Sequence, residues 1–353
     1  MSSWNPAVPG MPPLHRQVRW WVLAMLFCVT MINFVDRQTL GNSEQLTALI
    51  RLRDSAEEMG HTVYFIFPTE IAKIAKVDGL FIRSRTDPLN ISFVAAKMAE
   101  LRGIPVIDDP ESIRVCSDKV NMYLHLMRAG VRIPDTVFVR KRDMTERTAR
   151  DLLRELGSPL ILKEPSTSFS LRVEKVATVP EFLRTAKRFI KLSDWIVAQR
   201  FIESDFDWRV GVLDGEPLYA CRYIIPQETF KIQATVNGHI VYCAVRGIPL
   251  DRVPSPVLDT AVRAATAIGR GFYGVDIKDR EGTPYVIEVN DNPSLEGGED
   301  EHSPGLYRRI IGHLLGEDVP RDLHHGGPRA PIARLRKGPP QGIRDGVGAG
   351  HLF

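Results

Sequence analysis

The sequence predicts an α/β (α+β) protein, and two observations predict that fold class. From residue 42 onward, short apolar runs typical of buried strands alternate with stretches of helical periodicity, which indicates a parallel sheet with helices packed against it. Further along, two pairs of apolar strands are separated by tight polar turns at 214–215 and 279–282, which indicates antiparallel hairpins. The 353 residues suffice for about two or three compact domains.

The composition is that of an ordinary globular protein, with 44% hydrophobic and 25% charged residues. The formal net charge of +3 comes from the end of the chain, because six Arg and Lys but only two Asp follow Pro320. The remainder is close to neutral, which indicates no nucleic-acid partner. The four cysteines form no C-x-x-C pair, and we expect reduced thiols in a cytoplasmic protein.

The first 41 residues differ in character from the rest. Residues 1–15 contain many Pro, Ser and Gly residues and are predicted to be disordered. No charged residue occurs from Trp20 to Val35, which predicts one apolar helix slightly shorter than the about 20 residues that span a bilayer. We interpret residues 1–41 as a foreign leader, and a weak membrane tether through 20–35 is the alternative.

The stretch 16–41 resembles the first transmembrane helix of major-facilitator transporters, which often carry a run similar to "INFVDRQTL". Such transporters contain many helices of this kind, whereas the sequence contains a single candidate. The resemblance therefore does not indicate transport.

Residues 42–109 are predicted to form a small α/β domain. A helix begins at Ser43, a preferred N-cap residue, and ends at Gly60. Two buried strands, a helix and a further strand follow at 61–67, 79–84, 91–103 and 104–108. An opening strand and helix are missing, unless the preceding apolar segment takes their place.

Residues 110–317 are predicted to form the larger domain, and 318–353, rich in Pro, Gly and Arg, a disordered basic tail. The domain begins with a helix from Lys119 to near Gly130, and an extended segment starts at Pro134. The later elements are two strands around a Ser/Thr-rich turn at 159–176, a helix at 179–192, a strand at 195–202, a hairpin at 208–224, a helix at 256–270, a hairpin at 271–290 and a helix at 305–316.

The last hairpin carries three oxygen donors that suit a metal ion. Glu288 and Asn290 are two residues apart and so lie on one face of a strand, and Asp276 lies on the preceding strand. The tight turn at 279–282 can bring the three together. Carboxylate and amide oxygens suit Mg²⁺, which also shares its ligand shell with nucleotide phosphates. An acidic loop after an edge strand is the alternative interpretation.

The order of these three residues, followed by Pro293 and "LEGG", resembles the metal-binding end of ATP-grasp ligases, in the RimK-type and glutathione-synthetase-like branch. The similarity covers roughly residues 110–315. It implies an ATP-grasp fold for the larger domain and a truncated pre-ATP-grasp domain before it. It also implies ATP and Mg²⁺ as cofactors, with two ions, and Mn²⁺ as an alternative metal.

Two lysines are expected at the nucleotide phosphates. Lys163 ends the apolar strand "PLILK", where burying its ammonium is costly unless an anion pairs with it. It matches the ATP-grasp lysine that contacts phosphate, and Lys119 matches the earlier lysine of the family. A surface lysine is the alternative for Lys163. Relatives generally have glycines in the following phosphate-covering loop, where this chain has Ser166, Thr167, Ser168, Ser170 and Arg172.

The run "VAQRFIESDFDWR" matches the family's hinge strand, whose backbone pairs with the adenine edge. An ordinary edge strand is the alternative. The resemblance places at the nucleotide Gln199, Arg200, Phe201 and Ile202 for the base, and Glu203 or Asp207 for the ribose hydroxyls.

Arg209, Arg222 and Lys231 are predicted to form a positive set, with Gln233 next to it. The two arginines lie on the two arms of one hairpin, at positions expected to face the same side. The resemblance implies that this set binds the transferring phosphoryl group and the carboxylate substrate. Separate surface cations are the alternative.

These residues indicate a Mg·ATP-dependent ligase that activates a carboxylate as an acyl phosphate and condenses it with an amine, such as an amino acid or peptide. The alternative is a degenerate ATP- and metal-binding module without ligase activity, because the phosphate loop lacks glycine and the first domain is short. Acidic residues after the metal motif would favour an amine-bearing acceptor: Glu296, Glu299, Asp300 and Glu301.

Overall fold

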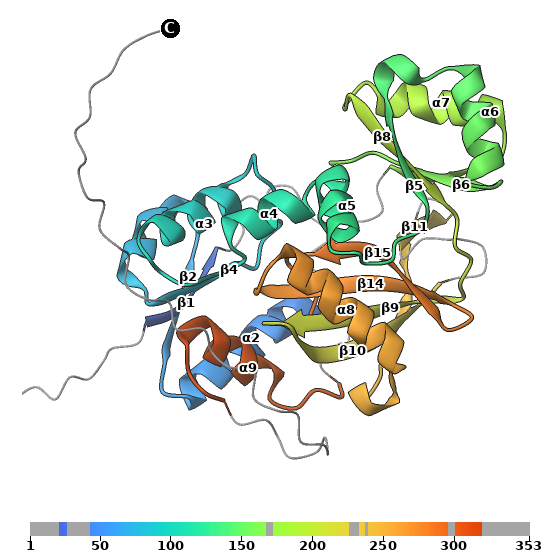
Figure 1. Ribbon diagram of the computed structural model, residues 1–353. Helices are drawn as coiled ribbons and strands as arrows, with labels where there is room; N and C mark the ends of the chain where they lie inside the picture. The colour runs from blue at the N-terminus through green and yellow to red at the C-terminus, as the bar shows by residue number, and fades with distance from the viewer. Residues whose placement is uncertain are drawn as a thin grey trace, which may run out of the picture. The chain divides into compact units, whose positions relative to one another are not determined.

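The computed structural model describes residues 21–26, 43–166, 172–225, 233–236, 239–295 and 301–319. These residues form the α/β architecture that the sequence predicts (Figure 1). Their strands make two four-stranded sheets, one five-stranded sheet and a two-stranded hairpin.

The first sheet is parallel and has the strand order β2-β1-β3-β4. Ile66, Ile74 and Leu80 are among the residues that form its buried core. The alternation of strands and helices predicted from residue 42 onward is therefore confirmed. The elements are β1 (Trp21–Leu26), α2 (Ser43–Glu58), β2 (Thr62–Ile66), η1 (Pro68–Lys76), β3 (Gly79–Phe81), α3 (Ile91–Leu101), β4 (Val106–Ile107) and α4 (Pro110–Cys116).

Residues 21–26 form a strand, so the prediction of an apolar helix over 20–35 is wrong for this part of the stretch. The remainder of the stretch lies outside the described residues. β1 pairs in parallel with both β2 and β3. Residues 21–26 therefore take the position of the opening strand that the sequence interpretation found missing. The resemblance to a transmembrane helix finds no support, since no described helix is long and apolar enough to cross a bilayer.

The second sheet is antiparallel, has the order β5-β8-β6-β7, and packs against two helices (Figure 1). Phe182 and Phe189 of the second helix fill its core. Thr178 and Glu181 close the start of that helix as a capping box. The elements are β5 (Thr136–Arg140), η2 (Lys141–Asp143), α6 (Glu146–Glu155), β6 (Leu160–Lys163), β7 (Val173–Val176), α7 (Val179–Phe189) and β8 (Trp195–Arg200).

The third sheet is antiparallel with the order β13-β10-β9-β14-β15 and contains both predicted hairpins. Its turns have positive φ at both central residues, 51° and 78° at Asp214 and Gly215, and 53° and 79° at Glu281 and Gly282. This is the turn geometry that matches the twist of the strands. The strands are β9 (Phe206–Leu213), β10 (Glu216–Ile224), β13 (Ala244–Gly247), β14 (Phe272–Arg280) and β15 (Thr283–Asn290).

Helices bury both faces of this sheet. Side chains of α5 (Lys119–Arg128) and α8 (Ser255–Ile268) pack with Trp208 and Val275 on one face. Side chains of α2 and α9 (Leu306–Leu315) pack with Cys221 on the other.

Several elements have no counterpart in the prediction, including η1, α4 and α6. Helix α6 buries Ala149 and Leu152, and charged residues occupy many of its other positions, so only a few apolar residues mark it in the sequence. The strands of the hairpin β11 (Gln233–Val236) and β12 (His239–Tyr242), the strand β13 and the segment η3 (Leu250–Arg252) were likewise not predicted.

A chain that begins at Asn42 lacks β1, and we expect it to be less stable than a chain that begins at Trp20. Its β2 and β3 would lose the ladder hydrogen bonds that β1 makes to both. Thermal unfolding followed by circular dichroism should show a midpoint lower by roughly 5 °C or more. Equal midpoints would contradict the placement of β1.

Candidate functional site

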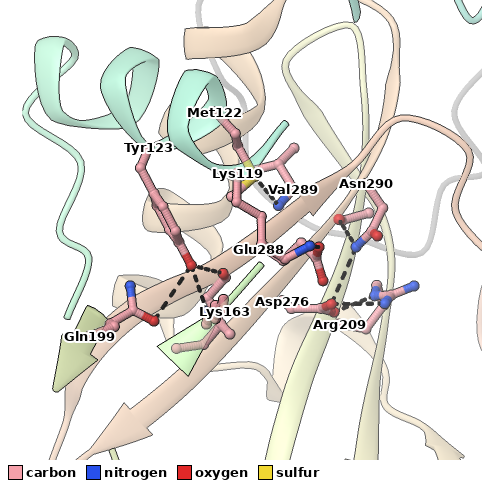
Figure 2. A network of polar contacts seen from close by, with 12 residues as sticks. Lys119, Met122, Tyr123, Lys163, Gln199, Arg209, Asp276, Glu288, Val289 and Asn290 are labelled. Atoms are coloured by element: carbon pink, nitrogen blue, oxygen red, sulfur yellow. Dashed lines mark hydrogen bonds and ion pairs between the residues drawn. The ribbon is translucent and has the colours of Figure 1, made fainter. Parts of the chain in front are cut away.

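The three predicted metal ligands lie together on the β14–β15 hairpin (Figure 2). Asp276 is the cross-strand partner of Glu288, and Asn290 is the partner of Gly274, so the three side chains share one face of the sheet. The register shifts next to Asp276, which leaves Ile287 as the extra residue of a β-bulge. The structure thus brings together the oxygen donors that the sequence predicts.

Asp276 is held by a guanidinium on the neighbouring strand. Arg209 lies opposite Asp276 in the β9–β14 ladder, and its Nε and Nη2 donate to the two carboxylate oxygens, the second at 2.9 Å. Only 3% of Asp276 and 8% of Arg209 is exposed. Burial raises the pKa of Asp276, and Arg209 opposes that shift. The Asn290 Nδ2 donates to Asp276 Oδ2 at 3.2 Å. The donor set is therefore compensated by positive charge.

Two lysines approach the same site from other elements (Figure 2). Lys119 opens α5 after the N-cap Asp118, and its Nζ lies 3.3 Å from Glu288 Oε1. Lys163 ends β6, is 5% exposed, and donates to the Tyr123 hydroxyl at 2.7 Å. Burial lowers the pKa of Lys163 to about 8, against the opposing effect of Glu288. A buried ammonium beside a neutral hydroxyl favours a bound anion.

The predicted hinge residues begin at the end of β8. Gln199 is buried, and its Nε2 donates to Thr136 Oγ1 at 2.8 Å. Ile202 is also buried. The Arg200 Nε donates to Asp135 Oδ2 at 2.8 Å. The roles of these residues at the adenine stay predictions.

Phe201 and the two carboxylates predicted for the ribose follow directly. The Lys175 Nζ lies 4.5 Å from the centre of the Phe201 ring. Asp207 forms a buried ion pair with Lys278, so its carboxylate already has a cationic partner. Glu203 is exposed, which makes it the accessible carboxylate of the two.

Arg209 and Arg222 lie on opposite faces of the sheet, so the prediction that they face the same side is wrong. Arg222 is opposite Trp208 in the β9–β10 ladder and shares its face, whereas Arg209 points to the other face. A register shift between Pro217 and Tyr219 is the reason, because one extra residue exchanges the faces of every later position. The Arg222 guanidinium lies 4.3 Å from the Trp208 ring centre.

Several predicted residues lie outside the described part of the chain, and their roles stay predictions. They are Lys231, the side chain of Gln233, Thr167, Ser168 and Ser170 of the loop, and Glu296, Glu299 and Asp300 of the acidic rim. Of their predicted neighbours, Ser166 and Glu301 are exposed, and Arg172 Nη1 lies 3.9 Å from Glu164 Oε2.

The sequence interpretation missed Tyr123 and Lys278, both of which contact predicted site residues. Tyr123 is fully buried and resembles any core aromatic in the sequence. Its spacing was an available signal, because residues four apart lie on one side of a helix, and Lys119 is four residues earlier.

A family model described as a RimK-like ATP-grasp domain matches residues 116–314. Among curated proteins, a probable alpha-L-glutamate ligase of Vibrio vulnificus is 25% identical over 74% of this chain and 88% of that protein. A probable alpha-L-glutamate ligase of Maridesulfovibrio salexigens is 30% identical over 61% of this chain and 68% of that protein.

Two solved structures share the fold. A D-alanine–D-alanine ligase from Bacillus anthracis has a TM-score of 0.63 at 16% identity, over 84% of this chain and 96% of that one. A RimK domain ATP-grasp protein from Sphaerobacter thermophilus has a TM-score of 0.59 at 19% identity, over 83% of this chain and 99% of that one. The predicted fold class is confirmed.

Replacing Lys163 with Met should stabilise the fold at neutral pH. The pKa of Lys163 is about 8 in the fold against 10.5 for an ordinary lysine, so folding disfavours its charged form. Below about pH 8 the buried charge lowers the free energy of unfolding by on the order of 3 kcal/mol, and this destabilisation disappears as the pH rises towards 10.5.

Denaturant unfolding of both proteins at neutral pH and near pH 10 measures this effect. The advantage of Lys163→Met should shrink at the higher pH. Lys187→Met, which replaces an exposed lysine of α7, is the matched control and should change stability little at either pH. A stability gain in Lys163→Met that does not change with pH would contradict the lowered pKa of Lys163.

Proposed function

This chain belongs to the RimK-like ATP-grasp family and is an ATP-dependent carboxylate–amine ligase, and from this premise we propose how its own residues perform that reaction and on which substrates. Mg·ATP activates a substrate carboxylate as an acyl phosphate, and the amino group of an amino acid or peptide then displaces phosphate. The observation that carries the proposal is the convergence of Asp276, Glu288 and Asn290 with the buried lysines Lys119 and Lys163.

The donor set fits a hard divalent cation. Asp276 and Glu288 supply carboxylate oxygens and Asn290 an amide oxygen, all from one face of the hairpin. The set contains two carboxylates and one amide, and among the described residues no group of three or more His, Cys, Asp and Glu is arranged to hold a metal. In this structure each carboxylate pairs with a cationic side chain: Asp276 with Arg209, and Glu288 with Lys119.

Magnesium, when bound, neutralises the triphosphate and polarises its γ-phosphorus. Asp276, Glu288 and Asn290 would hold it, with Glu288 shared if two ions are present. Lys163 and Lys119 bind phosphate oxygens. Arg209 contacts Asp276 and so lies beside the proposed metal ligands, from where it stabilises the phosphoryl group during transfer. Charges that are already oriented in a buried site need not reorient during the reaction, and they lower the activation free energy for this reason.

The chemical sequence has two displacements. A carboxylate oxygen attacks the γ-phosphorus, the bond to the β-phosphate oxygen breaks, and ADP leaves. The amine nitrogen then attacks the acyl carbon, the bond to phosphate breaks, and the nitrogen loses a proton. Water must be kept from the acyl phosphate between the two steps.

One substrate is proposed to be an α-amino acid. Curated relatives carry the name probable alpha-L-glutamate ligase, which supports glutamate as the first amine to test. Glu301, which follows the metal hairpin in the sequence, is exposed, and the other residues of the predicted acidic rim lie outside the described part of the chain.

ADP release that requires both a carboxylate and an amine tests the proposal, with mass spectrometry of the products. Glu288→Gln should reduce Mg²⁺-dependent ADP release by roughly a hundredfold or more, while nucleotide binding without Mg²⁺ changes little. Asp276 is less suitable, because its replacement leaves the buried Arg209 without its carboxylate partner. Mg·ATP binding without any ADP release across amino-acid and dipeptide pools would favour a degenerate module instead.

ATP affinity should fall as the pH rises above about 8. Lys163 has a pKa of about 8, and only its charged form pairs strongly with a phosphate. Calorimetry with a non-hydrolysable ATP analogue should show a loss of up to about tenfold per pH unit above that value. Lys163→Met should bind weakly with no such pH dependence, and a pH-independent affinity in the wild type would contradict the role of Lys163.

A further inference from the structure

Strand β15 lies at one end of its sheet, and side chains of α5 satisfy its outer edge (Figure 2). The Tyr123 hydroxyl donates to the Ile287 carbonyl at 2.7 Å, and the Val289 N–H donates to the Met122 sulfur at 3.2 Å. Edge backbone groups that are buried need such partners. Helix α5 therefore replaces a neighbouring strand at this part of β15.

The carbonyl that Tyr123 contacts belongs to the bulge. Ile287 is the extra residue of β15, so it has no partner residue on β14. It also directly precedes Glu288, the predicted metal ligand. A bulge re-aims the side chains beside it, so the partner that fixes the bulge also fixes the direction of Glu288.

The same hydroxyl contacts Lys163, and the number of protons on each group fixes the direction of each hydrogen bond. A phenol has a single proton to donate. The Ile287 carbonyl is 2.7 Å away and Gln199 Oε1 is 3.5 Å away, so the proton goes to Ile287. The phenol oxygen therefore accepts from Lys163, whose ammonium is 2.7 Å away.

We propose that Tyr123 is a positioning residue for phosphate binding, whose hydroxyl fixes the Lys163 ammonium and the bulge before Glu288 relative to each other. The inference rests on the proposed function, in which Lys163 and Glu288 face Mg·ATP from two different sheets. One oxygen thereby links the phosphate-binding lysine to the metal-binding strand.

A neutral partner suits this task better than a carboxylate would. Burial raises the pKa of Tyr123, so its proton stays on the oxygen at physiological pH. A carboxylate in its place would pair with Lys163 and cancel its charge. A phenol oxygen orients the ammonium and leaves its positive charge available to an anion.

Tyr123→Phe removes the hydroxyl and keeps the ring. Because a hydrogen bond to the charged ammonium favours that form, its loss should shift the titration midpoint of Lys163 below 8 in the nucleotide-free protein. NMR titration of isotope-labelled lysine measures this, with the resonance assigned by its absence in Lys163→Met. Affinity for the Mg·ATP analogue should weaken roughly three- to tenfold.

The matched control is Tyr273→Phe. Tyr273 is equally buried in the same core, and its hydroxyl contacts Ser112 Oγ at 2.6 Å rather than Lys163. The control should leave both the Lys163 titration and the nucleotide affinity unchanged. Site-specific 3-fluorotyrosine at position 123 keeps the hydroxyl while weakening it as an acceptor, and a smaller shift in the same direction is expected even if Tyr123→Phe folds poorly.

A double-mutant cycle separates the inference from the proposed function. Tyr123→Phe should have little further effect on affinity in a Lys163→Met background. An unchanged Lys163 titration in both Tyr123 variants would overturn the positioning role alone. Wild-type affinity for the Mg·ATP analogue in Lys163→Met would overturn the proposed role of Lys163 at the phosphates.

Discussion

The bidentate contact between Arg209 and Asp276 is the interaction on which the site depends. Both groups are almost fully buried on neighbouring strands, and each charge offsets the cost of burying the other. Removing one partner of such a pair costs about 3–5 kcal/mol, because the remaining charge is left without compensation. Arg209 therefore opposes the rise that burial causes in the pKa of Asp276, the proposed metal ligand, and the alignment of β9 with β14 decides where that carboxylate lies.

The sequence was sufficient where the geometry is local. Alternation along one strand places Glu288 and Asn290 on one face, and the turn before it brings Asp276 opposite, so the convergence of these three side chains was predictable. Arg222 was misplaced because a register shift upstream on β10 moved it to the other face, and no residue pattern announces that shift. Tyr123 required knowledge of how α5 packs on β15, which is a contact between distant parts of the chain.

The start of the chain shows the same limit at the level of an element. A run of apolar residues without charge is compatible with a helix and with a buried strand, and only the neighbours decide between them. Here β2 and β3 are separated in the sheet by one strand position, which Trp21–Leu26 occupies. The described strand has six residues, and the rest of the apolar segment lies outside the described residues.

The covering of β15 by α5 also bears on how the protein avoids self-association. An uncovered strand at the end of a sheet offers its backbone to a strand of another molecule, which is a common route to aggregation. On that side, Tyr123 and Met122 form hydrogen bonds with the backbone groups of Ile287 and Val289. The helix that carries Lys119, a proposed phosphate ligand, thus also protects the sheet against intermolecular strand addition, so resistance to aggregation and the proposed nucleotide binding depend on the same few contacts.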